Sequence, residues 1–235
     1  MHALDNVIWK ALATRQSAFA ETFDQASRFP REVTALAAFL EPSPRGYASL
    51  AGLLGVGGTA TLSLASPYQP QPKWDVIAAF PGLQMVAEKA VSETGDASSS
   101  LGRPDHTLAI TELAQRDSPE MVELATLTKP GPFGLRTYEL GTYVGIRSEG
   151  KLIAMAGERL KVPGYTEVSA VCTHPEHTGQ GYARGLMMEI MRGIRERGET
   201  PFLHVRQDNA RAVGLYEALG FLTRMVVHFT VLRKS

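Results

Sequence analysis

The feature that most constrains this chain is a glycine-containing turn between an alternating strand and a long amphipathic helix. The segment Glu167–Thr173 alternates polar and apolar residues, as a strand with one buried face does. Helical spacing of apolar residues then predicts a helix that begins near Tyr182 and is ended by Gly198. Gly179 and Gly181 let a ligand approach the backbone, and the amides of the first helical turn favour an anion. The turn therefore predicts an anion site of the pyrophosphate kind.

This turn does not match either of two common nucleotide motifs. No Gly-Lys-Ser/Thr follows the glycines, and Arg184 stands where the third glycine of a dinucleotide fingerprint would be. On spacing alone, an ordinary strand–helix turn is the simpler interpretation. For the same reason the glycine-rich stretch 55–58 is interpreted as a plain turn.

A second pattern lies about 25 residues further on, in the stretch QDNARAVGLYEALGF. Asn209 is placed to cap a helix that Gly220 closes, and Tyr216 lies two turns along that helix. A buried strand is predicted before it, at Phe202–Arg206, and a β-rich run after it, at Phe221–Leu232. Taken alone, this pattern indicates only a helix cap and a core aromatic residue.

Together the two patterns resemble the GNAT superfamily of acetyl-CoA-dependent N-acyltransferases, over roughly residues 106–232. The matching residues are Val171, Thr173, Pro175, Gly179, Gly181, Ala183, Asn209, Ala212, Leu215, Tyr216, Gly220 and Phe221. The resemblance implies an α+β GNAT acyltransferase fold, with a mixed, mostly antiparallel twisted sheet flanked by helices. In that fold the strands at 167–173 and 202–206 run parallel and splay apart to admit the donor.

The resemblance also implies where acetyl-CoA binds. It places the donor against Val171, Cys172, Thr173, Gly179, Gln180, Gly181, Tyr182, Ala183, Arg184 and Asn209. One position departs from the family signature, because Thr178 stands where the family has Arg or Gln. Since backbone amides do most of the phosphate binding, this departure implies weaker affinity rather than its loss.

The resemblance assigns Tyr216 as the acid that protonates the leaving thiolate. Three alternatives stay open for the base: Glu167, His204 on the neighbouring strand, or water. The structural alternatives are a solvated strand edge for Glu167 and a satisfied histidine for His204. Cys172 is interpreted as core packing in preference to an acyl carrier.

In the family, the connection between the first two helices often borders the acceptor site, and the resemblance places this connection at the loop Lys129–Glu139. Phe133, Arg136 and Tyr138 are therefore candidate acceptor contacts. His174 and His177 lack a third ligand at suitable spacing, so no metal is expected.

Composition limits partners and compartment. Lys plus Arg and Asp plus Glu both number 24, which argues against nucleic-acid binding. A single cysteine excludes an internal disulfide, and no apolar run is long enough to span a membrane. The N-terminal stretch lacks the features of a secretory signal, so a cytoplasmic protein is expected. A homodimer is one expected assembly, because pairing of sheet edges is common in the family.

A composition shift divides the chain into three parts. Residues 92–105 are rich in Ser and Gly and are interpreted as a linker. Residues 106–235 are the predicted acetyltransferase domain. Residues 1–91 are a predicted accessory α+β subdomain, or a degenerate second copy of the fold. In this part we expect helices near Leu4–Leu12, after Pro30 and at Tyr47–Leu54, and strands at 59–65, 76–80 and 83–87.

The expected function is direct transfer of an acetyl group from acetyl-CoA to a primary amine, on a small molecule or a peptide. The main alternative is a non-catalytic acyl-CoA-binding or sensing module with the same fold. A nucleotide-binding enzyme that uses the glycine turn is a second alternative.

Overall fold

The computed structural model describes residues 2–88 and 109–235. Its main element is an eight-stranded sheet in the order β4-β11-β5-β10-β9-β8-β7-β6. These strands are β4 (Thr59–Leu64), β5 (Trp74–Val86), β6 (Ile110–Leu113), β7 (Tyr143–Ser148), β8 (Lys151–Val162), β9 (Tyr165–Thr173), β10 (Thr200–Arg206) and β11 (Leu222–Lys234). A smaller sheet contains β1 (Glu21–Phe23), β2 (Ala26–Arg28) and β3 (Ala37–Phe39). The α-helices of the described part are α1 (Val7–Ala13), α2 (Pro44–Leu54), α3 (Ser118–Thr128), α4 (Tyr182–Glu196) and α5 (Ala210–Ala218).

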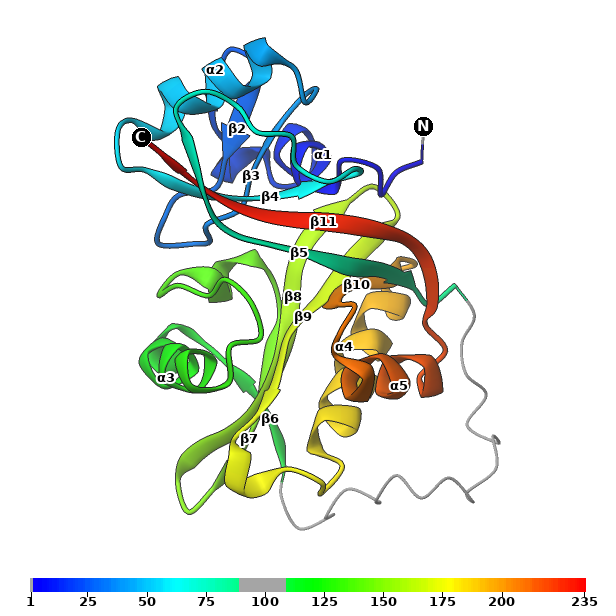
Figure 1. Cartoon of the computed structure of the whole chain (residues 1–235). Helices are drawn as coiled ribbons and strands as arrows, with labels where there is room; N and C mark the ends of the chain where they lie inside the picture. Colours follow the sequence, from blue (N-terminus) through cyan, green and yellow to red (C-terminus); the bar gives the residue numbers. More distant parts are fainter. Residues whose placement is uncertain (1, 89–108) are drawn as a thin grey trace.

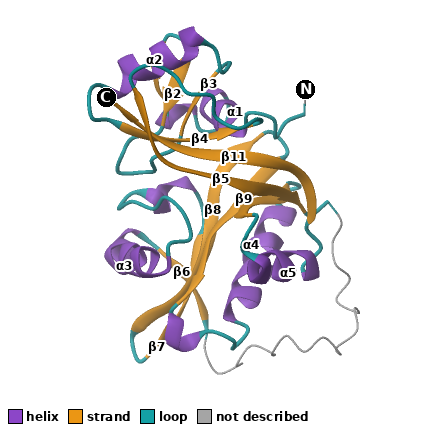
Figure 2. Cartoon of the chain, viewed as in Figure 1, coloured by secondary structure: helices purple, strands orange, loops and turns teal. Residues whose placement is uncertain are grey.

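Helices cover both faces of the large sheet. Helix α4 packs on one face of β8 and β9, and α3 packs on the opposite face (Figure 1). The apolar stripe of α4 that the sequence predicts is buried at Leu186, Met187, Ile190, Met191 and Ile194. Each of these side chains contributes about 1.5–3 kcal/mol when it is removed from water. The continuous twisted sheet with helices on its sides (Figure 2) confirms the predicted α+β class.

The strands β9 and β10 run parallel and then diverge, as predicted. Their pairing covers only Tyr165–Glu167 of β9 and Thr200–Phe202 of β10. The other neighbouring strands in this sheet are antiparallel. Beyond this point β9 carries a bulge against β8, where Ala170 has a φ of 53°. The pairing of β9 with β10 ends at Glu167 and Phe202, and the bulge lies on the part of β9 beyond this point.

The N-terminal part supplies two strands of the large sheet. Strand β5 lies between β10 and β11, and β4 pairs with the other side of β11. The predicted accessory part and the predicted acetyltransferase part therefore share one sheet. Their division into domains stays a prediction, and the predicted linker at 92–105 lies outside the described residues.

Two predictions for the N-terminal part are wrong. The expected helix after Pro30 is a turn followed by β3, which pairs with β2. Its apolar residues, Val33 and Leu36, are buried beside α1, so the spacing reflects burial rather than a helix. The two expected strands at 76–80 and 83–87 are one strand, β5, which continues through Pro81. The expected helices at Leu4–Leu12 and Tyr47–Leu54 correspond to α1 and α2, and the strand at 59–65 to β4.

Candidate functional site

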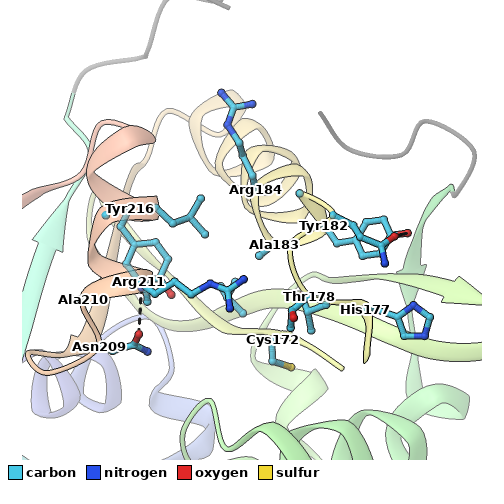
Figure 3. A pocket seen from close by; sticks show the side chains of 18 residues that line it. Cys172, His177, Thr178, Tyr182, Ala183, Arg184, Asn209, Ala210, Arg211 and Tyr216 are labelled. Atoms are coloured by element: carbon cyan, nitrogen blue, oxygen red, sulfur yellow. Dashed lines mark hydrogen bonds between the residues drawn. The ribbon is translucent and has the colours of Figure 1, made fainter. Parts of the chain in front are cut away.

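A cleft of about 580 Å³ opens where β9 ends, between the start of α4 and the start of α5. All ten residues predicted to contact acetyl-CoA line this cleft, and so does Tyr216. Figure 3 shows the labelled side chains around this cleft, which come from β9, the turn before α4 and the two helices. The cleft is also lined by residues that the sequence did not suggest as contacts: His177, Ala210, Arg211, Ala212, Gly214 and Leu215. The sequence patterns thus locate one continuous cavity.

The turn before α4 exposes its backbone to the cleft. Gly179 and Gly181 have φ values of 84° and 79°, a conformation that favours glycine. A side chain at Gly179 would meet no atom within 4 Å, so the space beside it is open. Helix α4 begins at Tyr182, and its first hydrogen bond runs from the Gly185 amide to the Gly181 carbonyl, so the amides that precede Gly185 lie at the N-terminal end of the helix. These amides and the positive end of the helix dipole make the turn suited to an anion.

The wall formed by α5 is held in place by its N-terminal cap. The side chain of Asn209 accepts a hydrogen bond from the amide of Ala212 at 3.1 Å, drawn as a dashed line in Figure 3. The cap fixes the first turn of the helix, and Tyr216 follows two turns later with only 8% of its surface exposed. Burial, and then the nearby Cys172 thiol, raise the pKa of Tyr216 to about 12. The phenol is therefore protonated throughout the neutral range.

Cys172 lines the cleft from β9 and shares an apolar cluster with residues packed around α3. Burial raises the pKa of its thiol to about 11, although hydrogen bonds with Thr128 and Met155 act in the other direction. A thiol in this state is a poor nucleophile at neutral pH. The environment of Cys172 thus favours the packing interpretation over an acyl carrier.

The charge of the cleft is one-sided. None of the eighteen residues that line it is acidic, while Arg184 and Arg211 are both among them. This bias is local, because acidic and basic residues balance over the whole chain. The cleft is therefore suited to a negatively charged ligand.

Glu167 does not line the cleft and is completely buried. Its carboxylate accepts two hydrogen bonds from the Arg159 guanidinium, at 2.9 and 2.8 Å, and one from the Leu160 amide at 3.3 Å. A fourth contact joins it to Nδ1 of His204 at 2.7 Å. Burial opposes ionisation, but Arg159 and His204 outweigh it and lower the pKa of Glu167 to about 2. The four lone-pair directions of this carboxylate are all occupied.

His204 is held between Glu167 and Gln84. The Oε1 atom of Gln84 accepts a hydrogen bond from Arg224 at 2.6 Å, and its Nε2 donates to the carbonyl of Leu4 at 3.1 Å. The same Nε2 lies 3.1 Å from Nε2 of His204, so this network makes that ring nitrogen the acceptor. The ring proton then lies on Nδ1 and is donated to Glu167. In this arrangement the one lone pair of the imidazole is engaged by Gln84.

The three predicted acceptor contacts lie outside the cleft. Phe133 and Tyr138 pack against the apolar cluster that contains Cys172, and Phe133 meets the ring of Tyr143 edge-on at 5.8 Å. Arg136 is paired with Glu139 at 2.7 Å. Phe133 and Tyr138 therefore lie on the side of the sheet that α3 covers, in the apolar cluster around Cys172.

Within residues 2–88 and 109–235, no three His, Cys, Asp or Glu side chains are grouped to hold a metal ion. No helix in the same ranges is long and apolar enough to cross a membrane.

Comparison with known proteins agrees with this geometry. A family model described as "FR47-like protein" matches residues 143–229. N-alpha-acetyltransferase RimI of Mycobacterium tuberculosis is 39% identical over 82 residues, which is 34% of this chain and 51% of that relative. The chain thus spans about half the length of this curated relative.

Two solved structures extend the similarity to the whole chain. A proposed GNAT-family acetyltransferase from Novosphingobium aromaticivorans has a TM-score of 0.88 and 37% identity, with 100% of both chains covered. A GCN5-related N-acetyltransferase from Kribbella flavida has a TM-score of 0.62 and 16% identity, with 97% of this chain and 96% of that chain covered. The second shows the fold alone. Fold and cleft define an acyltransferase architecture, and the chain belongs to the GNAT family of acetyltransferases.

Proposed function

We propose that this protein transfers an acetyl group from acetyl-CoA to a primary amine by direct attack within a ternary complex. The observation that carries this proposal is the single cleft that joins the glycine turn of α4 to Tyr216, without one acidic residue in its lining. Exposed amides suit the phosphates of the donor, and the gap between β9 and β10 suits its extended arm.

Tyr216 is the proposed partner of the leaving thiolate. A thiol has a pKa near 8.5, and the pKa of Tyr216 is raised to about 12. Complete proton transfer from this phenol to the thiolate would therefore be uphill by about 5 kcal/mol. The role that fits is donation of a hydrogen bond to the charge that develops on sulfur, with the final proton taken from solvent.

Water is the base that the contacts favour among the three alternatives. Glu167 has all its lone pairs occupied, and the one lone pair of His204 is engaged by Gln84. The amine then loses its proton to solvent before it attacks. The rate should accordingly rise with pH around the pKa of the acceptor amine. The pH midpoint of this rise should move when acceptors of different pKa are used. A profile that stays at one pKa for all acceptors would contradict this assignment.

The acceptor class proposed is a primary amine, on a small molecule or at a peptide N-terminus. The similarity to RimI, an N-alpha-acetyltransferase by name, favours including α-amines in any test. Acetyl-CoA binding would be measured by calorimetry, and release of CoA would be followed with a panel of small amines and short peptides.

The variant Tyr216→Phe provides the control for this experiment. We expect it to bind acetyl-CoA as the wild type does and to turn over about 100-fold more slowly. Binding without turnover on any amine would favour the non-catalytic module. Absence of acetyl-CoA binding by the wild type would contradict the proposal.

A further inference from the structure

Two arginines line the cleft. Arg184 is among the predicted acetyl-CoA contacts, and Arg211 is not. Arg211 lies in the first turn of α5, two residues after the cap residue Asn209. Figure 3 shows its side chain extending from α5 across the cleft toward Thr178, whereas Arg184 extends away from the other labelled residues. Both arginines line the cleft, and in this view Arg211 is the one that extends toward the labelled turn residue Thr178.

Nothing in the described part of the chain neutralises Arg211. It has no hydrogen-bond or ion-pair partner among residues 2–88 and 109–235. The arginines of the neighbouring surface differ, since Arg206 is paired with Asp208 at 2.6 Å and Arg192 with Glu189 at 2.6 Å. An arginine directed into an acid-free cleft retains its full fork of donors for a ligand.

The glycine turn on the opposite wall, residues 178–181, has no charged side chain of its own. Thr178 begins the glycine turn, and its hydroxyl donates to the carbonyl of Pro175 at 3.1 Å. This hydroxyl therefore stabilises the turn itself. The backbone amides that follow it supply partial charges only, so the turn contains no full positive charge of its own.

We infer that Arg211 binds the pyrophosphate of the acyl donor and supplies, from α5, the positive charge that the turn at Thr178 lacks. This inference rests on the proposed function. A planar guanidinium forms paired hydrogen bonds with phosphate oxygens, and the amides of Gly179–Tyr182 approach the same group from the other side. The pyrophosphate would thus be held between the two helices.

The test is calorimetric binding of acetyl-CoA and of 3′-dephospho-acetyl-CoA to purified full-length protein. Arg211→Ala should weaken binding of both ligands by about tenfold. Arg192→Ala is the matched control, because it removes the same charge from the outer face of α4, and we expect less than about a twofold change. Thr178→Arg in the Arg211→Ala background should restore much of the affinity, since it places a cation on the turn.

Each other outcome overturns the inference in a recognisable way. A loss confined to acetyl-CoA would assign Arg211 to the 3′-phosphate instead. Equal affinities of wild type and Arg211→Ala, with the wild type still binding, would show that the cation plays no part and would leave the proposed function intact. A wild type that binds neither ligand would overturn both proposals.

Discussion

At the scale of single residues, Glu167 is a buried carboxylate held by a guanidinium and a histidine. It is fully buried, and its charge is balanced by the buried guanidinium of Arg159. Glu167→Gln keeps the shape but leaves Arg159 without its counter-charge. We expect the free energy of unfolding to fall by about 3–5 kcal/mol, measured by urea denaturation at pH 7. Glu196→Gln, at an exposed ion pair of α4, is the control and should change it by less than about 0.5 kcal/mol.

The same residue predicts how stability depends on pH. The folded pKa of Glu167 is lowered to about 2 from an ordinary value of 4.5. Its stabilising contribution is therefore complete above pH 4.5 and is lost as the pH falls toward 2. The unfolding temperature of the wild type should decrease as the pH is lowered from 4.5 toward 2, and that of Glu167→Gln should decrease less. Parallel curves for the two proteins would refute the assignment.

Cys172 tests whether transfer is direct. Its pKa is raised to about 11 by burial, so little thiolate exists at neutral pH. We expect Cys172→Ala to keep the turnover rate within about threefold. Wild-type protein incubated with acetyl-CoA alone should show no acetylated species by intact mass spectrometry. Accumulation of an acetyl-enzyme would instead establish a two-step mechanism, even if the variant failed to fold.

At the scale of elements, a matched pair of glycines distinguishes the effect of filling the cleft beside the turn before α4 from the effect of backbone strain. Gly179 has a φ of 84° and Gly164, in the turn between β8 and β9, has a φ of 80°, and both have open space beside them. A leucine at either position costs about 1–2 kcal/mol of backbone strain. Only Gly179→Leu places a side chain in the cleft, so it alone should weaken acetyl-CoA binding, by at least about tenfold. Equal effects on binding would mean that strain, not occupancy, is responsible.

Elements whose signals are local were predictable from the sequence. Helix α5 has its cap at Asn209 and its closing glycine at Gly220, and helix α4 has a long apolar stripe; both occur where expected. The segment after Pro30 was not predictable, because β3 exists through its pairing with β2 rather than through its own pattern. Strand β5 continues through Pro81 because the carbonyl of Pro81 faces the end of β10, where Gln207 donates to it. The amide position of Pro81 points to the same side, opposite Gln207 and just past the end of β10, so the proline leaves the pairing of β5 with β11 intact.

In the candidate site too, features set by local motifs were predictable and features set by distant contacts were not. Residues that belong to the two motifs line one cleft, because the motifs sit at the ends of adjacent strands. Glu167 and His204 were expected near the acceptor, but their burial depends on Gln84 and Leu4, which come from the far N-terminal part. No local pattern in the sequence reports such a contact.

At the scale of the whole molecule, the two described parts of the chain are held together by strand pairing and by polar contacts. Strand β5 has β10 on one side and β11 on the other, so the N-terminal part completes the sheet on which α4 and α5 pack. A second link is the half-buried ion pair of Asp5 with Arg224. Arg224 also donates to the buried Gln84, which in turn contacts His204. Strand pairing and buried polar contacts across the same boundary favour unfolding in a single step.

The two tryptophans allow this cooperativity to be measured. Both Trp9 and Trp74 lie in the N-terminal part of the sequence. Trp9 packs against an apolar cluster that both parts share, and Trp74 pairs with Lys234 of β11, so tryptophan fluorescence reports on the N-terminal part and on its contacts with the C-terminal part. Ile190→Ala creates a cavity under α4, in the core of the C-terminal part, and should cost about 2–5 kcal/mol. If the sheet unfolds as one unit, the fluorescence midpoint in urea should fall as far as the circular-dichroism midpoint. A fluorescence midpoint that stays at the wild-type value, while the circular dichroism shows two transitions, would mean that the N-terminal part is a domain of its own.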